Sequence, residues 1–337
     1  MLDALRHLER GAIEAQVSAQ AKSIYLGDHT ALCRILGRQL IYVDTRDYAH
    51  ASHLMWEGFW EMWVTQAMAR CLEPGMVVAD VGANFGYYSL LMADAVGPSG
   101  TVVALEPNSQ IARLLRMSSS VNGFIDRLTV DARAASSATG ERLRLFIPDG
   151  HPMNASLLPT DVDVSALPEA GEVAEVETVT LDDALPERVD FVKIDAEGAE
   201  REIWHGMAKT LSANEGIQIF LEFNAVRSGS ESNAFLDEIE ALEFKLGFVD
   251  YDGRRKPTTR SEILSHGTED VILYLSRMPA IDEPDPEPLV LDTGPPSVQQ
   301  TLKKGSRDLY RRLAALRRRW NADRPAGSRL RRATARR

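Results

Sequence analysis

The chain has 337 residues and a formal net charge of −11, so it is long enough for one large α/β domain with appended segments. Its two cysteines are too few for a disulfide framework, which fits a protein of the reducing cytoplasm. The sequence has neither an N-terminal apolar leader nor an apolar stretch of about 18 residues, so we expect a cytoplasmic protein without a membrane-spanning helix.

Residues 1–73 are expected to form an extension that precedes the main domain. Residues 2–20 are amphipathic and predict a helix, and strands predicted at 31–36 and 40–44 form a hairpin. Three tryptophans, Trp56, Trp60 and Trp63, fall in a segment that begins a further predicted helix running to about residue 70. We expect these rings to anchor the extension on the core rather than to stack on a substrate.

Between residues 74 and 278, predicted strands alternate with predicted helices. Short apolar runs predict strands at 76–81, 101–106, 128–131, 189–195, 217–223, 248–251 and 270–276. Helices are predicted at 86–96, 108–121, 198–211 and 232–246, the last ended by Gly247. This alternation predicts an α/β fold with a largely parallel, doubly wound sheet and a ligand site outside the carboxyl ends of its strands.

The loop after the first of these strands carries the strongest functional signal. The loop, Asp80-Val81-Gly82-Ala83-Asn84-Phe85-Gly86, has two glycines, which permit a tight turn close to a ligand. The next strand ends in Glu106, a carboxylate placed 20 residues after Gly86 to accept hydrogen bonds from ribose hydroxyls. The pattern predicts a nucleoside cofactor site formed by Asp80, Gly82, Asn84, Gly86, Glu106 and Asn108.

The acid that opens this loop bears on the identity of the cofactor. Dinucleotide sites place a pyrophosphate at the following helix N-terminus, where an anion such as Asp80 is unfavourable. S-adenosylmethionine carries no phosphate but has an ammonium and a sulfonium, so an acidic loop suits it. The loop therefore favours S-adenosylmethionine over a nicotinamide cofactor, and a nicotinamide dehydrogenase is the less favoured alternative.

Further polar residues are expected at the same edge of the sheet. Asp195 closes the strand at 189–195 and is followed by Glu197, while Glu222 and Asn224 close the next strand. These four side chains are predicted to converge on one substrate hydroxyl or on one hard cation, and magnesium suits the oxygen ligands of Asp195, Glu222 and Asn224. The spacing does not itself require a metal.

Residues 141–181 interrupt the alternation, with strands near 142–147 and 175–180 around a loop at 149–172. Such an insertion is often a functional lid. His151, Asn154 and Ser156 lie in this loop, and the latter two could hydrogen-bond a sugar hydroxyl. The three residues are weak candidates for substrate contacts.

The end of the chain differs sharply from its body. Residues 279–297 hold six prolines and predict a linker, and residues 298–337 form a basic tail. Residues 301–337 carry 14 Lys/Arg and 2 Asp/Glu, a net of +12, whereas residues 1–300 carry 24 basic and 47 acidic side chains, a net of −23. Leucines and Trp320 recur in the tail at helical spacing, which suits either an anionic membrane surface or a disordered solvated tail.

Four segments together resemble the FkbM family of S-adenosylmethionine-dependent methyltransferases. They are Asp80–Tyr88, Glu106–Asn108, Thr180–Asp183 and Lys193–Glu200. The resemblance, over about residues 30–277, implies a Rossmann-like class I methyltransferase with a seven-stranded sheet and O-methylation of a sugar, polysaccharide or other secondary-metabolite hydroxyl. The implied catalytic residues are Asp195 as first candidate base, then Glu222 and Glu197.

Two alternatives stay open from the sequence. The chain could be a non-catalytic S-adenosylmethionine-binding scaffold in an envelope-polysaccharide assembly, with the basic tail as its functional part. In either reading, the tail would allow a peripheral position at the inner face of the membrane. Nucleic-acid methylation is less favoured, because the acidic body would repel a polyanion. The oligomeric state is not predicted.

Overall fold

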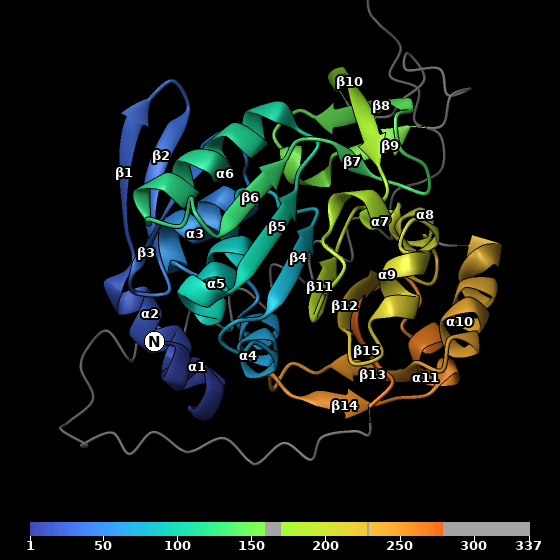
Figure 1. The fold of residues 1–337 in the computed structure, drawn as a ribbon. Helices are drawn as coiled ribbons and strands as arrows, with labels where there is room; N and C mark the ends of the chain where they lie inside the picture. Colours follow the sequence, from blue (N-terminus) through green and yellow to red (C-terminus); the bar gives the residue numbers. More distant parts are fainter. Residues whose placement is uncertain (159–169, 228, 279–337) are drawn as a thin grey trace, which may run out of the picture. The chain divides into compact units, whose positions relative to one another are not determined.

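An eight-stranded sheet lies at the centre of the computed structural model, which describes residues 1–158, 170–227 and 229–278. Across the sheet the strands follow the order β6, β5, β4, β11, β12, β15, β13 and β14 (Figure 1). Their bounds are β4 (Val77–Val81), β5 (Thr101–Leu105), β6 (Leu128–Asp131), β11 (Phe191–Ile194), β12 (Gln218–Phe223), β13 (Lys245–Val249), β14 (Arg255–Pro257) and β15 (Val271–Ser276). The five strands from β6 to β12 are parallel neighbours, whereas β15 is antiparallel to both β12 and β13.

The predicted doubly wound, mostly parallel sheet is confirmed, although eight strands replace the seven expected. The added strand, β14, is a three-residue edge strand paired only with β13 among the described residues. The chain passes from β4 to β5 and β6 on one side and then returns to β11 on the other side of β4. The strand order therefore reverses beside β4, which is where open α/β sheets bind their ligands.

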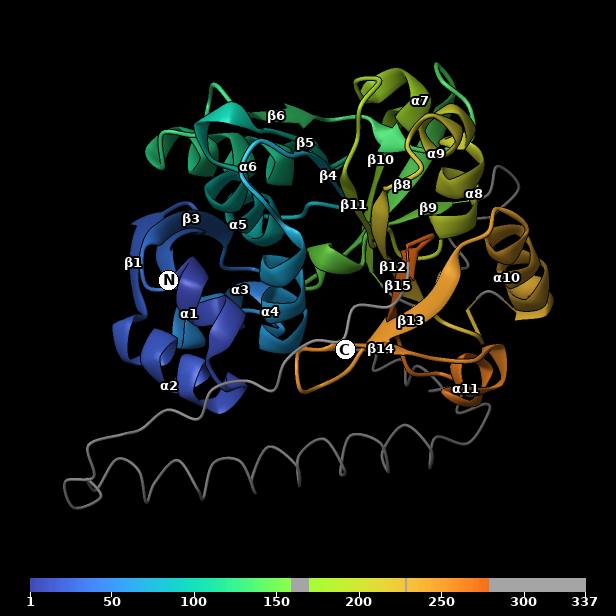
Figure 2. The same cartoon turned by 60° about the horizontal axis from the view of Figure 1, so that its bottom comes forward.

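Helices cover both faces of this sheet, as Figures 1 and 2 show together. Their buried side chains fall into two large apolar clusters, one with α5 and α6 and the other with α8, α9 and α10. The helices of the main domain are α5 (Tyr87–Val96), α6 (Ser109–Val121), α7 (Leu181–Ala184), α8 (Glu200–His205), α9 (Ala208–Ala213), α10 (Ser232–Ala241) and α11 (Arg260–Ser265), with short 3₁₀ turns at Gly97–Ser99, Pro152–Asn154 and Gly229–Glu231.

Two predicted helices are shorter than expected. The segment 198–211 forms α8 and α9 rather than one helix, and a Cβ added to Gly206 between them would lie 2.1 Å from the Ser136 carbonyl oxygen. The helix predicted at 232–246 ends at residue 241, because Glu243 takes the left-handed conformation (φ +65°) that commonly ends a helix, and the predicted end at Gly247 is wrong. Gly247 instead lies inside β13, so the expected start of that strand at residue 248 was three residues late.

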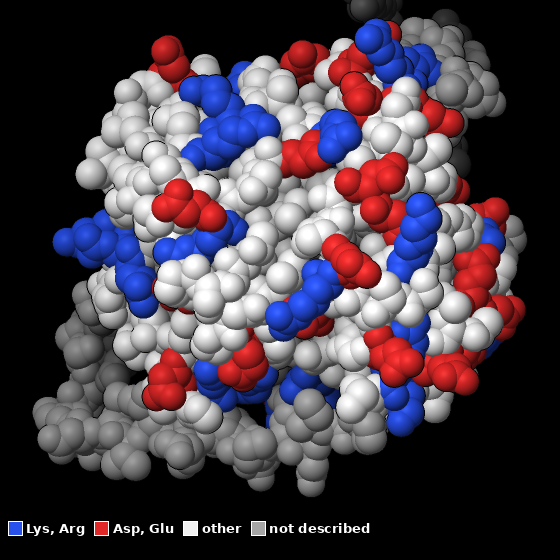
Figure 3. All heavy atoms as spheres, viewed as in Figure 1, with Lys and Arg blue, Asp and Glu red and all other residues white. Residues whose placement is uncertain are grey.

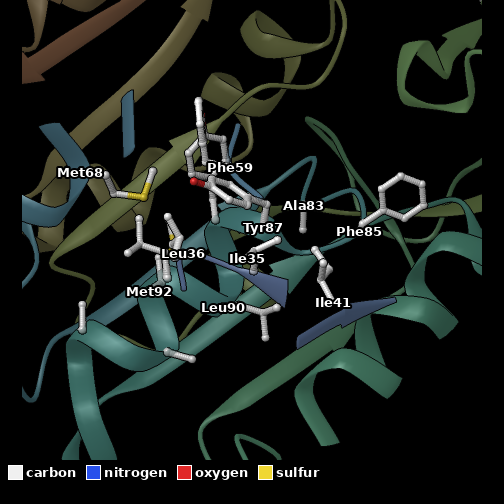
Figure 4. Close-up of a cluster of buried hydrophobic side chains, with 14 of the residues drawn as sticks. Ile35, Leu36, Ile41, Phe59, Met68, Ala83, Phe85, Tyr87, Leu90 and Met92 are labelled. Carbon is white, nitrogen blue, oxygen red and sulfur yellow. The ribbon is translucent and has the colours of Figure 1, made fainter. Parts of the chain in front are cut away.

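The N-terminal extension packs against α5. It consists of α1 (Leu2–His7), α2 (Arg10–Gln20), β1 (Lys22–Gly27), β2 (Thr30–Ile35), β3 (Gln39–Asp44), α3 (His50–Glu57) and α4 (Met62–Cys71), with β1, β2 and β3 forming an antiparallel sheet. Figure 4 shows side chains of the extension, such as Leu36 and Phe59, among Tyr87, Leu90 and Met92 of α5. The predicted hairpin is confirmed, β1 was not predicted, and the predicted helix 2–20 is divided in two at Leu8.

The expected anchoring role of the tryptophans is wrong for Trp56, whose side chain is 81% exposed. Trp63 does pack, with its ring 5.1 Å from that of Tyr251. Trp60 is half-buried and faces the cavities described below.

The insertion after β6 builds a third sheet, which has four strands. Its strands are β7 (Ala134–Ala135), β8 (Arg142–Pro148), β9 (Ser156–Leu158) and β10 (Gly171–Val179), in the order β7, β10, β8, β9. The two strands predicted in this insertion correspond to β8 and β10, while the middle of the predicted lid, residues 159–169, lies outside the described residues.

The chain divides into a unit at residues 1–288 and a second at 289–337, and the whole of the predicted linker and of the basic tail lies outside the described residues. Acidic and basic side chains are mixed on the face of the first unit seen in Figure 3. Within the described ranges, every helix is too short or too polar to cross a bilayer.

Candidate functional site

The loop between β4 and α5 is held tightly against the end of β11. Gly82 has a φ of +74°, and a Cβ at this position would lie 1.7 Å from the carbonyl oxygen of Asp195. The amides of Gly82 and Ala83 both donate to the Leu105 carbonyl at 3.0 Å. Glycine is therefore required at position 82 for close backbone contact as well as for the turn.

Gly86 plays a separate packing role. Its φ is +93°, and an added Cβ would lie 2.0 Å from a methyl carbon of Leu115 on α6. The predicted loop glycines are thus required by the fold, and Gly82 also lines the cavity that follows.

Glu106, at the end of β5, has two fixed hydrogen bonds. One carboxylate oxygen accepts from the Asn84 amide and the other accepts from the Asn108 amide, each at 2.8 Å. Burial raises the pKa of Glu106 to about 7. Each oxygen still has a lone pair free, so the carboxylate can accept the two ribose hydroxyls that the sequence predicted.

Asn84 and Asn108 shape the site in different ways. Asn84 has a left-handed backbone (φ +51°), and it lines the cavity. Asn108 caps α6, its side-chain oxygen accepting from the amides of Gln110 and Ile111. The structure therefore places Asn108 behind Glu106, as a residue that orients the carboxylate.

Asp80 lies beneath the site rather than in its wall. It is fully buried, accepts a 2.5 Å hydrogen bond from the Ser89 hydroxyl, and faces the ammonium of Lys193 at 3.8 Å. The parallel register of β4 and β11 sets this pairing, because Asp80 and Lys193 are direct partners across the two strands. Asp80 is absent from the described lining of the cavity, so its role is to fix Ser89 and Lys193.

A cavity at the carboxyl ends of β4, β5 and β11 is lined by three of the six predicted cofactor residues, Gly82, Asn84 and Glu106. Its lining includes apolar residues from α6 and the insertion sheet, such as Ile111, Ala135 and Leu145. The lining also includes Trp60, Tyr88, Lys193, Asp195 and Glu197. A slot that combines apolar residues with carboxylates suits the adenosine and the cationic methionine end of S-adenosylmethionine.

A second cavity adjoins the first and shares Trp60, Asp195 and Glu197 with it. Its described lining has seven carboxylates and one guanidinium, together with the aromatic side chains of Trp60, Trp63, Phe248 and Tyr251. The carboxylates are Glu61, Asp195, Glu197, Glu222, Asp250, Glu269 and Asp270. This cavity is therefore strongly acidic and partly aromatic.

Arg227 occupies the centre of the predicted carboxylate group. Its guanidinium lies 2.8 Å from Glu222, 3.3 Å from Glu197 and 3.0 Å from Asp270. Burial raises the pKa of Glu222, and the neighbouring carboxylates of Asp195 and Glu197 raise it further. Glu197 and Glu222 do lie close together, as predicted, but the group that they both contact is the Arg227 guanidinium and not a substrate hydroxyl or a metal ion.

The predicted metal ligands are arranged differently from a cation site. Asp195 is paired with Lys193 at 3.0 Å, and the amide of Asn224 donates to Asp270 and to the Thr268 carbonyl. The Asn224 oxygen accepts from the amides of Val226 and Arg227, so Asn224 holds the loop that carries the arginine. Across the described part of the chain, no three His, Cys, Asp or Glu residues are grouped as metal ligands.

Of the three weak candidates in the insertion, only Asn154 lines a cavity, the acidic one. The His151 ring packs edge-on against Tyr48, at 5.8 Å between centroids, and Ser156 lies in β9 opposite Phe146.

Several lining residues were missed by sequence reasoning. The sequence predicts an anchoring role for Trp60, gives no role to Glu61, and includes Lys193 only in the segment Lys193–Glu200. A lysine inside an otherwise apolar strand was a usable signal, because a buried ammonium requires carboxylate partners. Glu61 gave no such signal, because a glutamate at the start of a helix usually serves the helix dipole.

The order and directions of the strands, with a cavity at their carboxyl ends, are those of a class I methyltransferase fold. The Methyltransferase FkbM domain family matches residues 80–249, which is 170 of the 337 residues. The chain belongs to this family.

Two curated relatives are similar over part of their length. The 31-O-demethyl-FK506 methyltransferase FkbM of Streptomyces tacrolimicus is 34% identical over 161 residues, which cover 40% of this chain and 61% of that protein. The protein-L-isoaspartate O-methyltransferase of Hyperthermus butylicus is 38% identical over 66 residues, covering 18% of this chain and 27% of that protein. The match thus spans less than two thirds of either relative.

Solved structures of methyltransferases are distantly similar. A methyltransferase FkbM from Methylobacillus flagellatus has 16% identity and a TM-score of 0.39, covering 60% of this chain and 43% of that one. An S-adenosylmethionine-dependent O-methyltransferase from Thermotoga maritima has 14% identity and a TM-score of 0.37, covering 78% and 88% of the two chains.

Proposed function

We propose that this protein is an O-methyltransferase that uses S-adenosylmethionine to methylate a hydroxyl of a sugar or polysaccharide. Family membership supports the methyltransferase class and the cofactor, and gives no support to the scaffold alternative. The proposed class of acceptor is based on the second cavity, which shares Trp60, Asp195 and Glu197 with the cofactor slot.

The lining of that cavity suits a polyhydroxylated acceptor. Carboxylates accept hydrogen bonds from hydroxyl groups, and aromatic rings such as Trp60 and Trp63 can pack on the apolar face of a sugar. Seven carboxylates against one guanidinium would repel a phosphorylated or carboxylated acceptor. The electrostatics therefore favour a neutral or amino sugar.

When bound, S-adenosylmethionine supplies a methyl group already activated by its sulfonium, so the residues of this chain mainly have to align the reactants. Glu106 would hold the ribose, and Trp60 and Asp195 would face the acceptor from the wall shared by both cavities. Holding two reactants in near-attack geometry supplies on the order of 7–11 kcal/mol. Asp195 stays a predicted catalytic residue, and its ion pair with Lys193 suits orientation of the acceptor hydroxyl.

Transfer of a labelled methyl group to a matched set of acceptors tests this function. We expect product with methyl glucoside or methyl glucosaminide, and much less with methyl glucuronide, which differs by one carboxylate. Transfer to the glucuronide alone, or to none of a wider set of sugar hydroxyls, would contradict the proposed acceptor class.

From its sequence we also propose that the basic tail, which lies outside the described residues, binds anionic membrane surfaces. Each basic residue near such a surface contributes about 1 kcal/mol. Sedimentation with phosphatidylserine vesicles should retain the full chain and release a variant ended at residue 278. Equal retention of both would remove this role.

A further inference from the structure

We infer that Glu61, in the N-terminal extension, accepts the proton of the acceptor hydroxyl during methyl transfer. The inference rests on the proposed function and names a catalytic base outside the family-matched segment 80–249. As the acceptor oxygen forms its bond to the methyl carbon, the methyl–sulfur bond breaks and S-adenosylhomocysteine leaves. The hydroxyl proton passes to the Glu61 carboxylate and then to solvent.

The position of Glu61 is the first support. The residue directly follows Trp60 and lines the acidic cavity with it, beside the wall shared with the cofactor slot. Its backbone is left-handed (φ +34°, ψ +67°), which a glutamate rarely adopts, and the next residue, Met62, is fully buried. Backbone strain of this kind persists where the surroundings over-determine it and is concentrated at active sites.

The contacts of Glu61 connect the two cavities. One carboxylate oxygen accepts a 2.9 Å hydrogen bond from the hydroxyl of Tyr88, a residue that lines the cofactor slot. The Tyr88 ring in turn lies 5.0 Å from the Lys193 ammonium. Tyr88 therefore fixes the Glu61 carboxylate and leaves its remaining lone pairs available to a substrate.

The other carboxylates of the shared region are already engaged by cations. Asp195 is paired with Lys193, and Glu197, Glu222 and Asp270 surround Arg227. Each of these cations occupies carboxylate oxygens that an acceptor hydroxyl would otherwise contact. Among the described residues, Glu61 accepts its side-chain hydrogen bond from the Tyr88 hydroxyl, so its other oxygen can accept from an acceptor hydroxyl.

The electrostatic environment brings the pKa of Glu61 close to neutral pH. Burial and the carboxylates of Asp195 and Asp270 together raise its pKa to about 7, against the opposite effects of Tyr88 and Lys193. A base works only when ionised, so turnover should increase as the pH rises through about 7. Efficient general bases have a pKa near the working pH.

Glu61→Gln keeps the size of the side chain and removes the proton acceptor. With methyl glucoside, or whichever acceptor of the panel proves active, kcat at pH 8 should fall by about 10²–10⁴-fold. Calorimetry should show S-adenosylhomocysteine affinity within threefold of wild type. Glu73→Gln, at an exposed glutamate just after α4, is the matched control and should keep full turnover. A Glu61→Gln enzyme within threefold of wild-type kcat would overturn the assignment.

Tyr88→Phe separates a base from a merely structural glutamate. Loss of the hydroxyl removes a bond that lowers the Glu61 pKa, so the rising limb of the kcat–pH profile should move to higher pH. The limb should be absent in Glu61→Gln. Two results would assign the proton to another group. One is a rising limb of the kcat–pH profile that does not move in Tyr88→Phe. The other is a rising limb that is lost in Asp195→Asn but retained in Glu61→Gln.

One further readout needs no acceptor and so distinguishes failure of this inference from failure of the proposed function. Infrared spectra of the S-adenosylhomocysteine complex should contain a protonated-carboxyl band that disappears between about pH 6 and pH 8. Glu61→Gln should reduce that band by the contribution of one carboxyl group, since Glu106 and Glu197 also have pKa values raised to about 7. If the band is unchanged in the variant, Glu61 does not titrate near neutrality and cannot be the base, whether or not an acceptor has been found.

Discussion

The cofactor slot and the acidic cavity are built in different ways, although they share a wall. Of the 24 residues that line the slot, 2 lie outside the family-matched segment, whereas 10 of the 17 that line the acidic cavity do so. The slot depends on backbone turns, close glycine contacts and one buried carboxylate. The cavity depends on charged and aromatic side chains brought together from α4, β11, β12, β13 and the segment before β15.

This difference indicates how the two functions are divided. The family-matched segment supplies a site for a constant cofactor, and the residues outside it supply most of the surface that would select an acceptor. Changes in the slot should therefore affect folding and cofactor affinity, and changes in the cavity should affect acceptor choice and turnover.

The largest effect on the slot is expected for Gly82→Ala. The new Cβ would meet the Asp195 carbonyl at 1.7 Å, and the left-handed turn adds its own strain. Gly123→Ala is a matched control with a similar φ of +71° and open space around the new Cβ. The control should lose about 1–2 kcal/mol of unfolding free energy, and Gly82→Ala a further 1–3 kcal/mol or so for overpacking. If urea unfolding shows equal losses of unfolding free energy in the two variants, the close contact between Gly82 and the Asp195 carbonyl does not affect stability.

Glu106→Gln tests the carboxylate that the sequence predicts as the ribose ligand and that lines the cofactor slot. A hydrogen bond to a charged group contributes about 1.5–3 kcal/mol, so affinity for S-adenosylhomocysteine should fall at least tenfold in calorimetry. The wild-type pKa of Glu106 is raised to about 7 by burial, so affinity should rise with pH through that value as the carboxylate ionises. The glutamine variant should lack this pH dependence. An unchanged affinity in a folded variant would remove Glu106 from the cofactor site.

Arg227→Met provides a smaller and more specific test of the acidic cavity. Without the guanidinium, Glu197, Glu222 and Asp270 lose their shared cation, and the raised pKa of Glu222 should rise further. A carboxylate whose pKa is higher in the folded state destabilises the fold as pH rises, so the variant should lose stability, by roughly 1 kcal/mol, between pH 6 and pH 9.

Arg201→Met is the control, because its partners Glu231 and Glu238 lie at the surface and the pKa of Glu238 is lowered by Arg201. Its stability should be nearly constant over the same pH range. If the two variants respond alike in thermal unfolding, Arg227 is an ordinary surface cation.

The part of the site that could be predicted from the sequence is the part made of contiguous chain. The strand–turn–helix pattern alone predicts the positions of Gly82, Asn84 and Glu106, which line the cavity, whereas Asp80 lies beneath it. Asp195, Glu197 and Glu222 were also predicted, because the ends of neighbouring parallel strands meet at one edge of a sheet.

The remaining site residues required tertiary structure. Arg227 follows a turn that Asn224 stabilises, and Trp60 and Glu61 reach the site only because α3 and α4 pack on α5. The helix prediction failed at Gly247 for a similar reason, since pairing with β15 outweighed the local preference for a helix end.

A crystal structure of the protein with S-adenosylhomocysteine would test the central claim most directly. We predict that the ribose hydroxyls donate to Glu106 and that the sulfur faces the wall of Trp60 and Asp195 shared with the acidic cavity. A nucleoside bound away from Glu106, or a sulfur turned away from that wall, would contradict the account.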